Sequence, residues 1–252
     1  MTTAPSKPNK QLNNFGAQQT ADFVLSAVPS NATVLDVGAG PGAIAALLTK
    51  AGLSVTAIDA NENAIAEARA NGVDVQLQDF LQYTRGDYQK FDAILFARSL
   101  HHIQPIARAV AQAHALLKPD GVLLVDDFAA EQVDLETATF FFGLKSLLYS
   151  RTCEFHGRGP GLVDGRIPPN PLATWREHLF GKHGVTESTL MLPAIRDQFQ
   201  VTHESRLPYL YRYFMEDTSE TEAEALYEWE KQLCHLGTIR TIGLRVIARP
   251  YR

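Results

Sequence analysis

A loop near the start of this chain has the residue types and spacing that hold a nucleotide-like cofactor. Residues 34–45 read VLDVGAGPGAIA, in which Gly38, Gly40 and Gly42 follow a short apolar run and precede an alanine-rich stretch. Glycine permits the tight turn and the close backbone approach that such cofactors need. Gly38, Gly40 and Ala43 also satisfy the G-x-G-x-x-A spacing of dinucleotide-binding loops, so the loop by itself leaves the cofactor open.

The charges around the loop indicate which cofactor it holds. A pyrophosphate needs backbone N–H donors and is attracted to the positive end of a helix. Here Asp36 places a carboxylate at the mouth of the loop, Pro41 lacks an N–H group, and residues 31–49 contain neither Lys nor Arg. These features favour S-adenosylmethionine, which carries an ammonium and a sulfonium but no phosphate, over NAD(P). An NAD(P)-dependent oxidoreductase stays as the less favoured alternative.

Two further acidic residues follow apolar runs. Asp59 ends the run SVTAID, where its carboxylate can accept hydrogen bonds from both ribose hydroxyls of either cofactor. Asp79 can accept a hydrogen bond from the adenine amino group while Phe80 covers the face of the ring. Alternatively, Asp79 caps a short helix at 80–84, and it could serve in both ways.

The spacing of apolar residues predicts the elements that must position these groups. Apolar runs predict strands at 33–37, 54–59, 73–79, 91–97, 121–128, 199–205 and 241–248. Helical periodicity and stop signals predict helices at 18–28, 41–52, 61–72, 105–117 and 217–233. This alternation is typical of a doubly wound, mostly parallel α/β sheet covered on both faces. We expect residues 1–16 to form a flexible N-terminus and 17–252 a single domain, with an insert at about 129–190.

Five motifs in order resemble the class I S-adenosylmethionine-dependent methyltransferases, most closely the small-molecule type 11/type 25 group. They are VLDVGAGPG, AIDA, QDF, FDAILFARSLHHI and LLKPDGVLLVDDF, and the resemblance spans about residues 13–128. It implies a Rossmann-like sheet of seven strands with an antiparallel last strand. The aromatic and helical stretches of residues 129–190 then form a helical insert between strands five and six. The resemblance also implies S-adenosylmethionine-dependent methyl transfer to the oxygen or nitrogen of a small metabolite. A catalytically silent S-adenosylmethionine-binding protein is the alternative within this fold.

The resemblance and the loop chemistry together assign the cofactor site. The predicted cofactor-binding residues are Asp36, Gly38, Ala39, Gly40, Gly42, Asp59, Ala60, Asp79, Phe80, Arg98 and Ser99. Ala39 stands where many relatives have cysteine, a change that we expect to be silent because the loop acts through its backbone. Arg98 and Ser99 either line the cofactor or satisfy the end of the fourth strand.

Two adjacent histidines follow the fourth strand, in the segment SLHHI. His101 and His102 lie where this family places its reaction centre, and a histidine titrates near neutral pH, so either could remove a proton from a phenol or an amine. The pattern does not choose between them. Alternatively, both histidines pack against the protein or cap the next helix.

The substrate side is the least specified. The insert and the stretch PYLYRYF suggest Trp175, Tyr209, Tyr211 and Arg212 as substrate residues, although packing explains them equally well. Residues 151–183 contain five Lys and Arg residues but only three acidic residues, on a chain whose formal charge is −5. We therefore hypothesise a small acceptor with an acidic group.

Composition excludes several other classes of protein. The negative charge disfavours a nucleic-acid partner, and the absence of a signal peptide or a long apolar run predicts a cytoplasmic protein without a membrane partner. Asp126 and Asp127 are adjacent on a strand and should point to opposite faces, and Cys153 and Cys234 fit no metal spacing, so we expect no metal site. The oligomeric state is left open.

Overall fold

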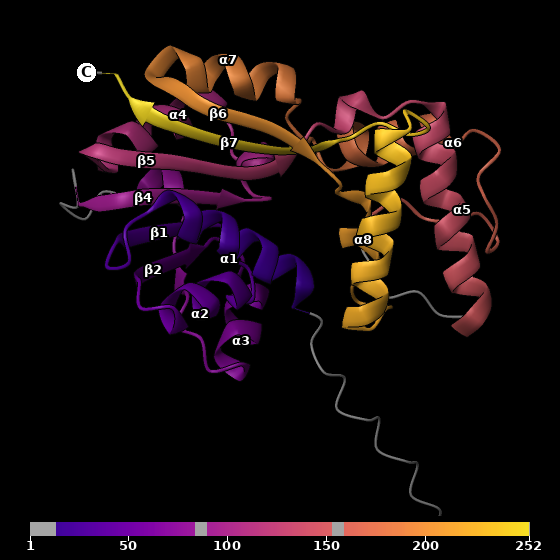
Figure 1. The fold of residues 1–252 in the computed structure, drawn as a ribbon, viewed down its shortest axis with the longest axis horizontal. Coiled ribbons are helices and arrows are strands. Elements are labelled where there is room, and N and C mark those ends of the chain that lie inside the picture. Colours follow the sequence, from indigo (N-terminus) through magenta and orange to yellow (C-terminus); the bar gives the residue numbers. More distant parts are fainter. Residues whose placement is uncertain (1–13, 84–89, 153–158, 252) are drawn as a thin grey trace, which may run out of the picture.

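Seven strands form one mixed sheet in the computed structural model, which describes residues 14–83, 90–152 and 159–251 (Figure 1). The strands are β1 (Thr33–Val37), β2 (Ser54–Asp59), β3 (Gln76–Leu77), β4 (Phe91–Ala97), β5 (Leu117–Phe128), β6 (Phe199–Leu207) and β7 (Gly243–Pro250). Their order is β3-β2-β1-β4-β5-β7-β6, and β7 runs antiparallel to both of its neighbours. The predicted doubly wound, mostly parallel sheet with an antiparallel last strand is thereby confirmed.

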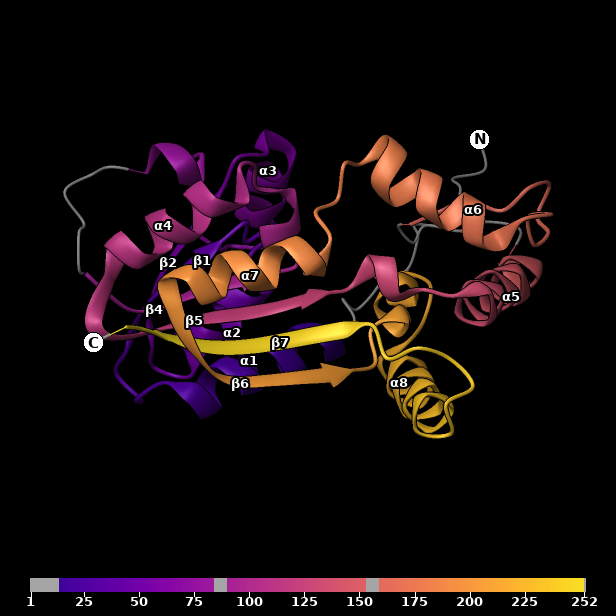
Figure 2. The same ribbon diagram turned by 90° about the horizontal axis from the view of Figure 1, so that it is seen from above.

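Helices cover both faces of the sheet (Figures 1 and 2). One face carries α1 (Phe15–Ala27), α2 (Ala43–Lys50) and α3 (Glu62–Ala70), and the other carries α4 (Ile106–Leu116) and α7 (Ser188–Gln198). Because successive side chains of a strand point to opposite faces, Val34 joins the core beneath α1 and α2 whereas Leu35 joins the core beneath α4 and α7. Burial of continuously apolar strands between two layers of helices explains why their sequences show no polar alternation.

A second apolar core lies beyond the carboxyl ends of the parallel strands. It is built by α5 (Leu135–Thr152), α6 (Pro171–Arg176), the π-helical turn η4 (Glu177–Lys182), the 3₁₀ turn η5 (Leu210–Phe214) and α8 (Glu220–His235). Phe141, Trp175 and Phe214 are fully buried there. The arrowheads of β4 and β5 point toward this group of helices (Figure 1). The sheet therefore presents the carboxyl ends of its parallel strands to this second core.

Several element boundaries differ from expectation. The third strand is only Gln76–Leu77, because it pairs with β2 alone and its side chains are exposed. The fifth strand begins at Leu117, which was expected to end the preceding helix and which instead pairs with Phe91 of β4. Helix α1 starts at Phe15, inside the expected tail, and residues 1–13 lie outside the described part of the chain. No helix in the described ranges has the length and apolar character needed for a membrane span.

Candidate active site at the carboxyl ends of the strands

The glycine loop joins β1 to α2 and is held against the neighbouring strand. The N–H groups of Gly38 and Ala39 both donate to the carbonyl oxygen of Ile58, at 2.9 and 3.0 Å. Gly38 has a φ of 70°, and a Cβ atom at this position would lie 2.5 Å from the Cβ of Ser99. The loop therefore requires glycine here both for its left-handed backbone and for its close contact with the end of β4.

Asp59, the last residue of β2, reaches back to the glycine loop. Its Oδ2 accepts a hydrogen bond from the N–H of Gly40 at 2.8 Å, and its Oδ1 accepts one from the N–H of Asn61 at 2.8 Å. Each carboxylate oxygen can accept a further hydrogen bond, so both retain capacity for ligand hydroxyls. Ala60, which follows, is exposed beside it.

Asp36, which is buried, and Arg98, which is half-buried, both have buried polar atoms without hydrogen-bond partners. Asp36 is 0% exposed and no described residue hydrogen-bonds either of its carboxylate oxygens. Burial raises the pKa of Asp36 to about 7, against the lowering effect of Arg98 nearby. Arg98 has a φ of 56°, and its buried Nη1 has no hydrogen-bond partner in the described structure. Unpaired buried charges are costly, so these two groups are candidates for contact with a ligand, and cofactor binding by them stays a prediction.

The other predicted cofactor residues near the strand ends make contacts within the protein. Asp79 accepts a hydrogen bond from the N–H of Leu81 at 2.7 Å and so caps a short 3₁₀ turn, which was the alternative expected for it. Phe80 is 4% exposed and contacts Phe96 edge-to-face at 5.3 Å. The hydroxyl of Ser99 donates to a β1 carbonyl at 2.6 Å. Adenine recognition by Asp79 and Phe80 stays a prediction.

His101 forms a dyad with Asp127 at the ends of β4 and β5. Nδ1 of His101 lies 2.6 Å from Oδ1 of Asp127, and both side chains are buried. The carboxylate of Asp127 also accepts from the N–H of Phe128 at 2.9 Å, which fixes its orientation. The ring of His102 lies 4.0 Å from that of His101 but is exposed. The structure therefore distinguishes two histidines that the sequence could not.

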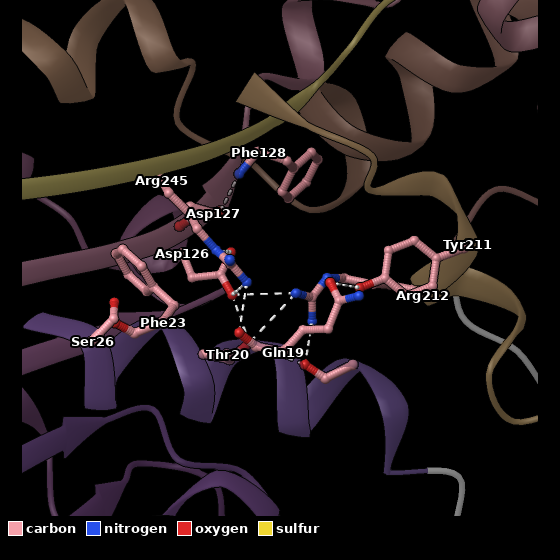
Figure 3. Close-up of polar contacts among 11 residues, drawn as sticks. Gln19, Thr20, Phe23, Ser26, Asp126, Asp127, Phe128, Tyr211, Arg212 and Arg245 are labelled. Carbon is pink, nitrogen blue, oxygen red and sulfur yellow. Dashed lines mark hydrogen bonds and ion pairs between the residues drawn. The ribbon is translucent and has the colours of Figure 1, made fainter. Parts of the chain in front are cut away.

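Asp126 points to the other face of β5 and joins a buried ionic network (Figure 3). It contacts Arg212 at 3.2 Å, Arg245 at 3.4 Å and the hydroxyl of Thr20 at 2.5 Å. Burial by itself would raise the pKa of Asp126, but Arg212 and Arg245 outweigh it and hold the pKa below its usual range. The expectation that Asp126 and Asp127 point apart is confirmed, since Asp127 serves His101 instead.

The predicted substrate residues are all buried or nearly so. Trp175 is 0% exposed and its indole N–H donates to the carbonyl of Ala130 at 3.2 Å. Tyr209 stacks on Phe128 at 4.5 Å, Tyr211 is 1% exposed, and Arg212 belongs to the network around Asp126 (Figure 3). Packing therefore accounts for Trp175, Tyr211 and Arg212, and substrate contact by these residues stays a prediction.

Glu230 of α8 is a residue that the sequence analysis missed. Its buried carboxylate accepts hydrogen bonds from the N–H groups of Tyr209, Leu210 and Tyr211, at 2.7, 2.9 and 2.9 Å. It thereby holds the start of η5, whose residues contact α1 and the end of β5. Glu230 lies in a run of charged residues on a helix, so nothing in the sequence distinguished it from a solvated face. In the described ranges no group of three or more His, Cys, Asp or Glu side chains could hold a metal ion.

Comparisons with known proteins agree with this geometry. A family model described as a methyltransferase domain matches residues 11–157. A ubiquinone biosynthesis O-methyltransferase from Xylella fastidiosa (strain 9a5c) is 30% identical over 213 residues, which cover 82% of this chain and 82% of that relative.

Solved structures share the fold at low sequence identity. An S-adenosylmethionine-dependent methyltransferase from Mesorhizobium loti has a TM-score of 0.58 at 19% identity and covers 93% of this chain and 100% of its own. A protein from Pyrococcus horikoshii OT3 also has a TM-score of 0.58, at 16% identity, with 96% and 93% covered.

The described residues fit S-adenosylmethionine. Its methionine part carries an ammonium and a carboxylate, which complement the unpaired carboxylate of Asp36 and the unpaired Nη1 of Arg98. Asp59 has remaining acceptor capacity for ribose hydroxyls beside the glycine loop. The matched family model and the relative from Xylella fastidiosa place this chain in the class I methyltransferases. The protein belongs to that family and is a methyltransferase that uses S-adenosylmethionine as its methyl donor.

Proposed function

We propose that the protein methylates a hydroxyl oxygen of a small molecule, with His101 as general base and Asp127 as the residue that orients it. The observation that carries this proposal is the 2.6 Å contact between Nδ1 of His101 and Oδ1 of Asp127. The printed name of the relative from Xylella fastidiosa, an O-methyltransferase, favours oxygen over the nitrogen that the sequence left open.

The dyad accounts for the proton that an attacking hydroxyl must lose. When the Nδ1–H group of His101 donates a hydrogen bond to Asp127, Nε2 is left as the basic nitrogen, and no described residue hydrogen-bonds it. Nε2 then accepts the hydroxyl proton while Asp127 stabilises the resulting imidazolium. S-adenosylmethionine supplies the electrophilic methyl group on its sulfonium. Burial of both side chains keeps water from competing for the proton.

His102 is suited to a different task. Although part of His102 is exposed, partial loss of solvent around its ring and the neighbouring His101 lower its pKa to about 4, so the imidazole is neutral near pH 7. A neutral imidazole presents one N–H donor and one acceptor nitrogen, which suits contact with a substrate. We therefore assign the base to His101 and a substrate-contacting role to His102.

The acceptor atom can be tested without knowing the substrate. The protein is incubated with S-adenosylmethionine carrying a ¹³C-labelled methyl group and a cell metabolite extract, and labelled products are examined by NMR and mass spectrometry. Methoxyl products support the proposal. N-methyl or C-methyl products would refute the oxygen assignment, and no labelled product from any extract would refute turnover of a free metabolite.

A further inference from the structure

The loop after η4 contacts the 3₁₀ turn Leu100–His102, which carries His101 and is called the catalytic turn below. The N–H of Thr186 donates to the carbonyl of His101 at 2.9 Å, and the side chains of Gln104 and Thr186 are hydrogen-bonded. His183 is three residues before Thr186, and it is among the groups that lower the pKa of His102. The insert therefore brings another imidazole beside the reaction centre.

His183 also contacts the ring of a further histidine, His178. The ring of His178, on the π-helical turn η4, lies 4.5 Å from that of His183, and the N–H of His183 donates to the carbonyl of His178 at 3.2 Å. Lys145 of α5 is near enough to lower the pKa of His178. Its buried Nζ donates to the carbonyl of Pro160 at 2.7 Å. Positively chargeable groups thus run from the catalytic turn into the insert.

Among the residues that the structure describes, no negative charge offsets the lowered pKa of His178. Loss of solvent is the largest cause that lowers the pKa of His178, to about 4, and three positive groups add to it: His183, Lys145 and Lys182. Nearer the site, Asp127 partly offsets the effect on His102, and Asp217 partly offsets the effect of burial on Lys145. An anion placed between the rings would allow them to donate charge-assisted hydrogen bonds.

We propose that His102, His178 and His183 form a binding face for an oxyanion, a carboxylate or a phosphate, on the methyl acceptor. The acceptor is then a small acidic molecule whose hydroxyl lies at His101 while its acidic group lies against the outer histidines. This inference rests on the proposed function, because it takes the site of methyl transfer to be at His101.

The structure moves the acidic-substrate hypothesis from arginines to histidines. Arg166 and Arg176 of the insert are exposed, and Arg158 lies outside the described residues. Arg176 lines a separate surface hollow of about 480 Å³ together with Asn170 and Glu177. The hydrogen-bond donors that adjoin the catalytic turn are instead the imidazoles.

Benzoate and its neutral isostere benzamide test this proposal on protein saturated with S-adenosylhomocysteine. Binding is followed through the imidazole resonances by NMR, in the wild type and in the double variant His178→Asn/His183→Asn. His235→Asn, an exposed change at the end of α8, is the control. We expect benzoate to bind about tenfold more tightly than benzamide and to shift the outer histidine resonances. The double variant should lose this preference, and the control should keep it.

Competition by inorganic phosphate separates the two sources of the oxyanion. Displacement of benzoate by phosphate indicates a general oxyanion face, and its absence assigns the face to carboxylates. Equal affinities for benzoate and benzamide, no saturable benzoate binding, or an unchanged preference in the double variant would overturn the inference. These outcomes do not depend on the product analysis, so an N-methyl product would refute the oxygen assignment while leaving the benzoate preference intact.

Discussion

Two buried carboxylates, Asp36 and Asp126, lie near the same guanidinium group, that of Arg98, and serve different ends. Asp126 has hydrogen-bonded and ionic partners on α1, η5 and β7, and its pKa is held below the usual range. Asp36 has no hydrogen-bond partner among the described residues, and its pKa is raised to about 7. Both carboxylates are almost completely buried, so the difference between their pKa values comes from their hydrogen-bonded and ionic partners.

This difference separates structural groups from ligand-binding groups. A fully paired buried network such as that of Asp126 fixes the relative positions of elements, whereas an unpaired buried charge costs free energy that protonation or a bound ligand offsets. His101 is intermediate, because Nδ1 is paired with Asp127 and Nε2 has no described partner. We call groups with an unpaired polar atom open and fully paired groups closed. Mutation of an open group should change ligand binding or turnover, and mutation of a closed group should change the free energy of unfolding.

The largest effect is expected at His101. Loss of a general base costs about 10²- to 10⁴-fold in rate, so His101→Ala should lower turnover by that order while affinity for S-adenosylhomocysteine changes little. Turnover is measured with the acceptor found in the labelling experiment, and affinity by calorimetry. His102→Ala is the matched variant and should lower turnover less. An equal or greater loss in His102→Ala would transfer the base to His102.

The next largest effect is expected at Arg212, a closed group, and concerns the free energy of unfolding. Removing one partner of a buried ion pair leaves an uncompensated charge, so Arg212→Ala should lower the free energy of unfolding by about 3 kcal/mol. Urea denaturation measures this change. Arg196→Ala, which breaks an exposed pair with Glu204 at 2.7 Å, should cost less than about 1 kcal/mol. Unchanged stability with lost turnover would make Arg212 a substrate residue, as the sequence suggested.

How far the sequence predicts this molecule depends on the range of the interactions. The glycine loop and the carboxylate of Asp59 follow from local turn chemistry and strand periodicity. The pairing of His101 with Asp127 depends on the register that places β4 beside β5, where Ala97 pairs with Asp126. Contacts of this kind join residues distant in sequence, so types and spacing alone could not separate the two histidines.

The segment between β6 and β7 shows the same limit more strongly. Arg212 and Asp126 are separated by 86 residues in the chain, and Tyr211 and Gln19 by 192. A cluster of Tyr and Arg looks alike whether it faces a ligand or a core, because both environments favour the same side chains. The role of such residues is decided by which elements the fold brings together, here η5, α1 and β5.

Asp36→Asn should change cofactor affinity and stability of the ligand-free protein in opposite directions. Loss of a charge-assisted contact to the ammonium should weaken S-adenosylhomocysteine binding by roughly ten- to a hundredfold. Without ligand at pH 8, the variant should be more stable than the wild type, because an unpaired buried carboxylate is removed. Calorimetry and urea denaturation measure the two quantities. Weaker binding together with lower stability would indicate a structural role.

The pH dependence of this stability difference follows from the raised pKa. Between about pH 4 and pH 7 the folded protein holds a proton on Asp36 that the unfolded chain has released. The wild type should therefore lose stability relative to Asp36→Asn as pH rises through this window, by at most about 1.4 kcal/mol per pH unit. Glu230, whose pKa burial also raises to about 7, contributes a slope of the same sign to both proteins and cancels in the difference.

The smallest effect is expected at Tyr211, where packing and substrate binding make opposite predictions. Its hydroxyl lies 3.4 Å from Oε1 of Gln19, a long hydrogen bond, and burial raises its pKa to about 12. Tyr211→Phe keeps the ring and removes only this contact. The free energy of unfolding and the activation free energy of turnover should therefore each change by less than about 1 kcal/mol. Tyr209→Phe, in the same motif, is the comparison, because its ring stacks on Phe128 beside His101. A tenfold loss of turnover in Tyr211→Phe without loss of stability would show that the hydroxyl contacts the acceptor, and Tyr211 would then belong with the open groups.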